Sequence, residues 1–174
     1  MLNTDWLKCY QYIGSYIVRV LIRDDQSHFY CGVPFAPTFW MLAKGDRPTL
    51  GDFAREDARL AKRLQKLSAD ETYFEDEFWT WINSADEEHP LIDGGMDEPI
   101  LQSNLEEFKE ALLQKLIEES SVQMSHIKKG ICTTLGDAAY LLDFINWHDM
   151  MDIVQSTNEE PSKGLSTLKL YHNI

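Results

Sequence analysis

The sequence predicts a mixed α/β (α+β) domain in which an N-terminal antiparallel β-hairpin packs with several amphipathic helices. Two β-rich runs, Tyr16 to Arg23 and His28 to Phe35, flank the turn-forming residues DDQS, which is the pattern of a hairpin. Several later segments carry apolar residues at helical spacing. With 174 residues, of which 44% are hydrophobic, the chain has enough apolar surface to bury a core. We therefore expect one globular domain over residues 1–174.

The N-terminal elements are predicted from alternation. In the first β-rich run one face is wholly apolar, formed by Tyr16, Val18, Val20 and Ile22, and the other is mixed. The residues before it, DWLKCYQYIGS, fit a short helix that stops at Gly14 or another strand, and both alternatives stay open. At the other end of the chain, LSTLKLYHNI alternates well enough to form a terminal strand that joins the same sheet.

The first helix is predicted in PTLGDFAREDARLAKRLQKL, with Thr49 or Asp52 as its N-terminal cap. The second follows a capping-box pattern, SADE at 68–71, and places Phe74 and Phe78 on one face. Trp79 falls beside that face, so we expect it to be partly exposed and available to a partner. The basic side of the first helix is expected to pair with carboxylates or to be solvated.

The remaining predicted elements are a loop and two helices. The stretch SADEEHPLIDGGMDEP contains His89-Pro90 and a Gly-Gly pair, so it reads as an exposed loop. The segment SNLEEFKEALLQKLIEE forms a helix capped by Ser103, and TTLGDAAYLLDFINWHDMMDIVQS forms another long helix.

The negative charge of the chain is concentrated in one segment. Thirteen acidic residues and no lysine or arginine lie between Leu67 and Phe108, while the other sixteen acidic residues balance the 16 lysines and arginines. The net charge of -13 therefore resides in that segment. Such a segment repels phosphate and anionic lipid, and attracts basic proteins by long-range steering. This predicts a cationic protein partner, with no direct nucleic acid and no membrane surface; the simpler alternative is a solvated face that keeps the protein soluble.

The cysteines and the N-terminus indicate a reducing compartment. Cys9, Cys31 and Cys132 are odd in number and widely spaced, which disfavours both a disulfide framework and a zinc site. The sequence shows no signal peptide and no apolar run long enough to span a membrane. We expect a cytoplasmic protein.

No motif in the sequence predicts catalysis. His28 and Cys31 would lie on opposite faces of a strand, and no recognisable motif surrounds Cys9 or Cys132. The phosphate-binding glycine motifs are absent. We therefore expect no enzyme activity and no cofactor.

One group of side chains has the spacing of a metal site. His148 and Asp152 are four residues apart on a helix, with Asp149 adjacent. Two such ligands fall short of a complete site, because a catalytic metal normally has three protein ligands and the sequence offers no second histidine-acid pair. We expect no metal, and a helix-surface hydrogen bond or ion pair is the favoured interpretation.

In overall character, with EDEFWTW and SADEEHP presenting its charge, the chain resembles small acidic bacterial immunity proteins, including those of contact-dependent growth inhibition systems. The resemblance implies an antitoxin-like inhibitor that neutralises a basic cognate toxin, such as a nuclease, by surface complementarity. The residues expected to bind that partner are the acids and one aromatic of the charged segment: Glu75, Asp76, Glu77, Trp79, Asp86, Glu87, Glu88, Asp93, Asp97 and Glu98.

Three alternatives to that function or binding mode stay open. A partner strand could add to an open edge of the predicted hairpin. The carboxylates could imitate nucleic acid phosphates toward a DNA-binding defence protein, although they are crowded rather than spaced along a surface. A small metal-dependent hydrolase would use His148, Asp149 and Asp152.

Overall fold

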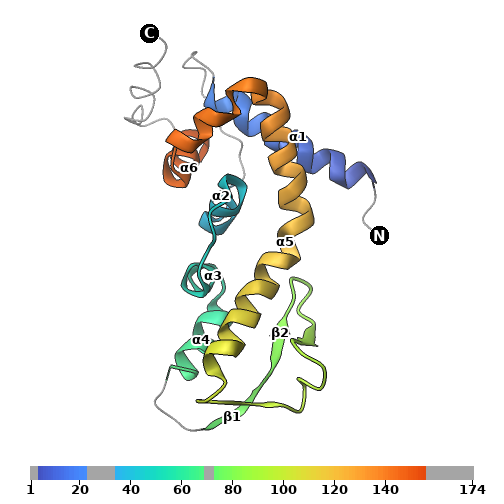
Figure 1. The fold of residues 1–174 in the computed structure, drawn as a ribbon, viewed down its shortest axis with the longest axis vertical. Coiled ribbons are helices and arrows are strands. Elements are labelled where there is room, and N and C mark those ends of the chain that lie inside the picture. Colours follow the sequence, from blue (N-terminus) through green and yellow to red (C-terminus); the bar gives the residue numbers. More distant parts are fainter. Residues whose placement is uncertain (1–3, 23–33, 69–72, 156–174) are drawn as a thin grey trace. The chain divides into compact units, whose positions relative to one another are not determined.

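The computed structural model describes residues 4–22, 34–68 and 73–155, and these residues confirm the α+β class (Figure 1). Helices make up most of them, and the strands are short and pair antiparallel. In chain order the elements are α1 (Thr4–Leu21), α2 (Pro37–Lys44), α3 (Leu50–Glu56), α4 (Ala58–Lys66), β1 (Tyr73–Phe78), β2 (Thr80–Ile82), β3 (Glu88–Pro90), β4 (Pro99–Leu101), α5 (Leu105–Leu135), the 3-10 helix η1 (Gly136–Phe144) and α6 (Trp147–Gln155).

The chain divides into two compact units. The helical unit comprises residues 1–47 and 123–174, and the mixed unit comprises residues 48–122. All four strands belong to the mixed unit, together with α3, α4 and the first part of α5. The single globular domain expected over residues 1–174 stays a proposal.

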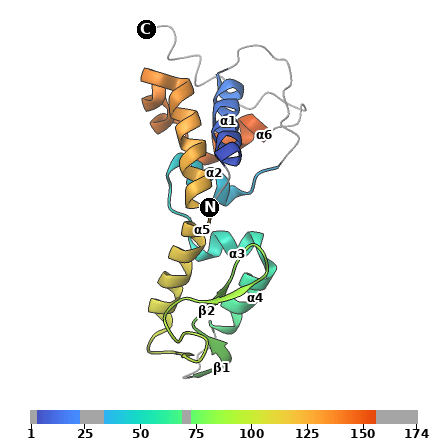
Figure 2. The ribbon, with the colours of Figure 1, turned by 90° about the vertical axis from the view of Figure 1, so that its right-hand side faces the viewer.

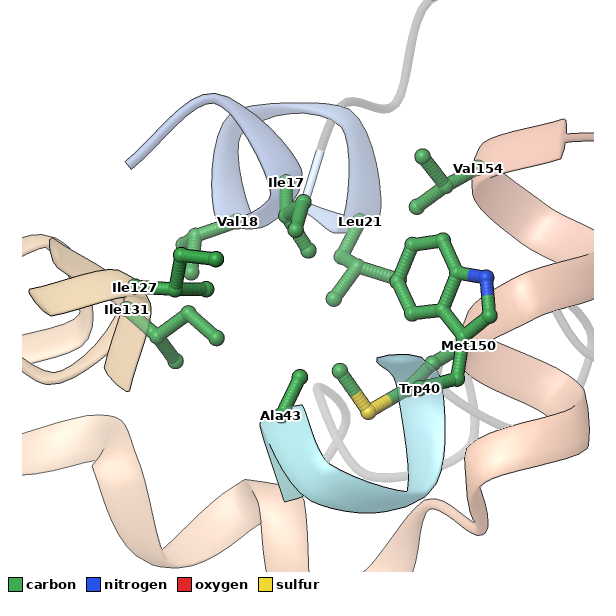
Figure 3. Packing of buried hydrophobic residues seen from close by; sticks show 9 residues of the cluster. All are labelled: Ile17, Val18, Leu21, Trp40, Ala43, Ile127, Ile131, Met150 and Val154. Atoms are coloured by element: carbon green, nitrogen blue, oxygen red, sulfur yellow. The ribbon is translucent and has the colours of Figure 1, made fainter. Parts of the chain in front are cut away.

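The helical unit is built around Trp40 of α2. Helix α6 packs against both α1 and α2, and Figure 3 shows the Trp40 ring beside Leu21 and Val154. The indole Nε1 donates to Gln155 Oε1 at 2.6 Å, so the polar atom of this buried ring is satisfied. A fully buried aromatic ring of this kind contributes about 2–3 kcal/mol through removal of its apolar surface from water.

Two glycines let α1 and α5 approach closely within the helical unit. A Cβ atom on Gly14 would overlap the carbonyl of Ile127, and one on Gly130 would overlap the carbonyl of Gln11. Ser15 Oγ donates to the Gly130 carbonyl at 3.3 Å across the same crossing. The absence of side chains at these two positions is therefore what brings the two backbones into contact.

The predicted N-terminal hairpin is wrong in its first strand. Residues 16–21 belong to α1, which also includes Gly14 in its interior rather than stopping there. The same apolar residues satisfy a helical pattern, because Ile17, Val18 and Leu21 all face the core. Packing against α2, α5 and α6 thus decides between two periodicities that the local sequence leaves nearly equal. The second predicted strand lies almost wholly outside the described residues, as does the terminal strand.

The helix predicted after Pro48 is confirmed in type and in its cap, but it is broken into two. Thr49 Oγ1 accepts from the Asp52 backbone at 3.2 Å while Asp52 Oδ2 accepts from the Thr49 backbone at 2.8 Å, a reciprocal capping box. Asp57 then has extended backbone and caps α4 by accepting from the backbone of Arg59. The break turns α4 so that Leu60 contacts the core of the mixed unit.

The mixed unit contains two two-stranded antiparallel sheets. β1 pairs with β4, Tyr73 opposite Leu101 and Phe78 opposite Pro99, with an irregular register at Asp76, whose φ is 59°. β2 pairs with β3 as a hairpin, Trp81 opposite His89. Figure 2 shows these strands and α3 and α4 grouped around the first part of α5, which supplies Leu105, Phe108 and Leu112 to the core.

The amphipathic helix predicted over 68–82 is wrong, because residues 73–82 form β1 and β2. Phe74 is buried, the exposed Asp76 marks the irregularity, and Trp79 and Trp81 are both buried two residues apart. This spacing of two places the indoles on the core side of extended backbone. Trp79 is accordingly buried rather than partly exposed, in edge-to-face contact with Phe108 at 5.7 Å. Of the predicted capping box, Ser68 follows the end of α4 and its hydroxyl donates to the Gln65 carbonyl at 2.7 Å, and Glu71 lies outside the described residues.

The C-terminal elements differ from prediction in their boundaries. α5 begins at Leu105, so Ser103 lies before the cap, and it runs on for 31 residues through the predicted start of the last helix. Gly136, with φ of 55°, ends it, and the chain continues as η1. Asn146 then caps α6 by accepting from the Asp149 backbone at 2.9 Å. Among the described residues, no helix has both the length and the apolar character required to cross a membrane.

Candidate partner-binding surface

The tip of the β2–β3 hairpin is held in one conformation by Asn83. Its Oδ1 accepts from the backbone N–H groups of Ala85 and Glu87, both at 2.9 Å, and its Nδ2 donates to Glu87 Oε2 at 3.1 Å. Asp86 adopts a φ of 64°, the left-handed conformation that a tight turn of this kind requires. Outside the tip, Arg59 of α4 donates to Asp86, and Glu119 of α5 accepts from the Ser84 backbone at 2.7 Å. The backbone that carries the exposed acids of the tip is therefore held in one conformation by these hydrogen bonds.

Arg63 of α4 supports the base of the same hairpin. Its guanidinium donates to the carbonyls of Phe78 and Thr80, both at 2.7 Å, and to Glu77 Oε2 at 2.8 Å. The guanidinium also lies 5.0 Å from the centre of the Phe108 ring. Arg63 thus satisfies the hydrogen-bonding needs of the Phe78 and Thr80 carbonyls. These two carbonyls are therefore not available to pair with another strand.

The basic side of the helix after Pro48 pairs with carboxylates, as the sequence predicts. Arg55 pairs with Asp52 at 2.7 Å, and Lys66 pairs with Glu77 at 3.2 Å. Hydrogen bonds to Asp86 and then to Asp57 raise the pKa of Arg59 above its ordinary value. Most of this positive charge is therefore used inside the mixed unit.

The predicted partner-binding residues fall into two groups. Glu77 is enclosed by Arg63 and Lys66, and Trp79 is part of the core, so neither offers a free surface. Glu75 lies in β1. The others are exposed: Asp76 in β1, Asp86, Glu87 and Glu88 at the hairpin, and Asp93, Asp97 and Glu98 in the turns between β3 and β4. Their role in binding stays a prediction.

Exposed apolar side chains accompany these acids. Ile82 ends β2, and Ile92 and Met96 lie in the turns after β3, with 41% and 48% of their surface exposed. Gly95 holds those turns against the hairpin, because its Cα packs on the Trp79 carbonyl so closely that a Cβ atom would overlap it. We call residues 82–98 the hairpin surface. It combines exposed apolar and acidic side chains, and its backbone is held by the hydrogen bonds of Asn83, and the base of the hairpin by those of Arg63.

The candidate nucleophiles and metal ligands of the helical unit are not assembled into a site. Cys9 on α1 and Cys132 on α5 are free, exposed thiols, and Cys31 lies outside the described residues. His148 stacks on Trp147 at 3.4 Å, and Asp149 is occupied by the cap of α6. In the described ranges no three metal-ligating side chains come together. The interpretation favoured from sequence, a helix-surface hydrogen bond or ion pair of this group, stays a prediction for His148 and Asp152.

The fold and this surface describe an α+β protein whose exposed features suit binding to another protein. Comparison with known families identifies it further: the model of the HECT-domain (ubiquitin-transferase) family matches residues 2–173. The chain therefore belongs to the HECT-domain family. No curated protein sequence matches the chain.

This family membership corrects the functional predictions made from sequence. The resemblance to immunity proteins is wrong, and so are the toxin-neutralising function and the basic toxin partner, because HECT domains work with E2 enzymes and ubiquitin. The expectation of no enzyme activity is also wrong, since the family is one of ubiquitin transferases. The family match likewise replaces the two alternative functions, a nucleic-acid mimic and a metal-dependent hydrolase.

Two residues that organise the surface were not singled out as functional from sequence. Asn83 directly precedes the acid-rich turn, and an asparagine before such a turn is a recognised signal for side-chain bonds to the backbone. Arg63 sits among four other basic residues of one helix face, and nothing in its local sequence distinguishes it from them. Only the arrangement of α4 against β2 gives it a special role.

Proposed function

We propose that this chain takes part in ubiquitin transfer and that its mixed unit binds the ubiquitin-charged E2 carrier through the hairpin surface. The observation that carries the transfer function is the family match over residues 2–173. The hairpin surface supports the docking role because it combines exposed apolar side chains with exposed carboxylates, a composition that suits a protein-protein interface. A cytoplasmic location fits this function and is part of the proposal; cell fractionation tests it.

Rigidity of the surface favours its use in binding. The backbone of the hairpin tip is fixed by Asn83, and its base by Arg63. A surface that is already ordered loses little conformational entropy when a partner docks, so more of the contact free energy appears as affinity. Exposed carboxylates around the apolar side chains would mainly raise the association rate and its sensitivity to salt.

The first experiment measures binding to a panel of charged E2 carriers by isothermal titration calorimetry. Ile92→Asp and Met96→Asp place a charge on the proposed contact, and each is expected to weaken binding about tenfold or more. Val122→Asp is the matched control, because Val122 is 45% exposed, in the same range as Ile92 and Met96, but lies on α5. Equal binding by all three variants would move the contact away from the hairpin surface.

The second experiment asks whether the chain also receives ubiquitin. A thiol can accept an acyl group by attacking its carbonyl carbon, which forms a new thioester and releases the carrier group. The chain is mixed with the charged carrier, and adducts are separated with and without reducing agent. If the chain only docks the carrier, the carrier binds or releases its ubiquitin, and no reducible adduct forms on this chain. An adduct that is lost in Cys9→Ser, Cys31→Ser or Cys132→Ser would replace docking alone with a covalent relay.

A further inference from the structure

His89 stands at the hairpin surface between an amide and a carboxylate. Its Nε2 lies 3.0 Å from Asn83 Nδ2 and 3.5 Å from Glu87 Oε2. Its ring lies 5.9 Å from that of Trp81, the residue opposite it in the β2–β3 ladder. The imidazole is partly exposed, so protons from solvent reach it.

The orientation of the Asn83 amide makes His89 Nε2 the hydrogen-bond acceptor in this arrangement. Asn83 Oδ1 must be the oxygen, because it accepts two backbone N–H groups, those of Ala85 and Glu87. The other amide atom is therefore the NH2 group, which only donates, so His89 Nε2 accepts from it. An Nε2 atom that accepts a hydrogen bond belongs to the imidazole tautomer with its proton on Nδ1.

Protonation reverses the character of Nε2. An Nε2–H group cannot bond to the Asn83 NH2, but the Glu87 carboxylate is within a small side-chain movement at 3.5 Å. The other charged groups around the hairpin are engaged elsewhere: Arg59 with Asp86, Glu119 with the Ser84 backbone, and Lys115 5.9 Å from the Trp81 ring. Glu87 is thus the acceptor that a protonated His89 meets.

We propose that His89, Asn83 and Glu87 form a proton-operated switch at the hairpin tip. Neutral His89 accepts from the Asn83 amide, which also donates to Glu87 Oε2; protonated His89 instead pairs with Glu87 and adds one positive charge to the tip. The switch stands on the hydrogen-bond geometry alone. Its consequence for the carrier rests on the proposed function: acidification weakens binding of a partner drawn by the carboxylates.

The direct test is a pH titration of the isotopically labelled chain by NMR. At pH 7.5 the long-range nitrogen spectrum is expected to show His89 with an unprotonated Nε2 and a proton on Nδ1. On acidification the Asn83 side-chain amide signal should shift with the same midpoint as the His89 ring. The Gln114 amide, which donates to Glu118 at 3.2 Å, is the control and should not follow that midpoint. An Nε2–H tautomer at neutral pH, or an Asn83 signal that ignores His89, overturns the proposal.

A variant separates the two partners of His89. Glu87→Gln removes the carboxylate that receives the protonated ring, so the midpoint of the His89 ring signals is expected to be lower than in the wild-type chain. The Asn83 signal should still follow His89 in this variant, since its contact with Nε2 is kept. An unchanged midpoint would show that Glu87 does not receive the protonated ring and would refute the switch.

A binding measurement tests the consequence. Carrier affinity of the wild-type chain is expected to fall about threefold between pH 7.5 and pH 6.0 relative to His89→Gln, which cannot take up the proton. If no carrier binds at either pH, the proposed function fails while the NMR experiment still decides the switch. If the carrier binds with the same pH dependence in both proteins, the switch does not regulate binding.

Discussion

Replacement of Arg63 by alanine tests the structural basis of the hairpin surface. The Arg63 side chain is only 18% exposed, and that of its partner Glu77 is 13% exposed. Arg63→Ala removes charge-assisted bonds to the carbonyls of Phe78 and Thr80 and a contact with the Phe108 ring. Glu77 keeps Lys66 at 3.2 Å, so its carboxylate is not left wholly uncompensated. We expect a loss of about 2–4 kcal/mol in the stability of the mixed unit, toward the lower end of the range for broken buried pairs.

Amide hydrogen exchange reports this loss within the unit itself. The N–H groups of Trp79 and Leu91 are suitable reporters, because they bond to the carbonyls of Glu98 and Trp79 at 3.0 and 2.8 Å, next to the Arg63 contacts. A loss of about 2–4 kcal/mol predicts exchange about 30- to 900-fold faster at these sites, provided that they open with the unit as a whole.

The matched control for Arg63 is Arg55 of the neighbouring helix. Arg55 also pairs with one carboxylate, Asp52, but its side chain is 79% exposed. Arg55→Ala is expected to change stability by no more than about 0.5 kcal/mol. If Arg63→Ala and Arg55→Ala accelerate exchange equally, the guanidinium is not the support that its contacts suggest, and the reasoning from burial is refuted.

Two further predictions concern local backbone geometry and pH. Gly14→Ala should destabilise the helical unit by about 2 kcal/mol or more in thermal denaturation, because its Cβ would overlap the Ile127 carbonyl. Gly51→Ala is the control, because its Cβ would meet only Thr49 Oγ1 at 3.5 Å. This second variant should be neutral or stabilising by about 0.5 kcal/mol. Hydrogen bonds from the Thr49 backbone and hydroxyl lower the pKa of the Asp52 carboxyl below 3.8, so its contribution is present at neutral pH and is lost as the pH falls below that value. Asp52→Ala should therefore cost about 1 kcal/mol at pH 7 and progressively less at pH 3, and an equal cost at both values would contradict this role.

Helix ends were predictable from sequence where the signal is a local hydrogen bond. Thr49 and Asp52 are three residues apart before an apolar pattern, and that spacing alone creates the reciprocal cap that the structure shows. The core side of α5 was equally readable, since Leu105, Phe108 and Leu112 recur at helical spacing and are buried. Such features depend on residues close in sequence, so no knowledge of the tertiary structure is needed.

The exchange of helix and strand in two places has the opposite origin. Ile17 and Val18 favour strand by residue type, yet α1 is stabilised by contacts with residues more than a hundred positions later, among them Ile127 and Ile131. Conversely, residues 73–82 fit a helical pattern in the sequence, but they form strands because they pair with β3 and β4. In both cases distant partners decide, and tertiary packing of this kind overrides intrinsic propensity.

The acidic segment shows why net charge misidentified the partner. Several of its carboxylates are used to build the unit; for example, Glu77 binds Arg63, Glu88 accepts from Thr80, and Asp86 binds Arg59. Arg59 and Arg63 lie outside the acidic segment. A charge count restricted to the segment therefore leaves out the positive charges that pair with these acids. What remains outward is a smaller acidic rim beside exposed apolar side chains, and a rim of that kind sets association rate and orientation without specifying which basic surface it meets. Partner identity therefore has to come from family membership and binding experiments, because the charge pattern is compatible with a toxin and with an E2 carrier alike.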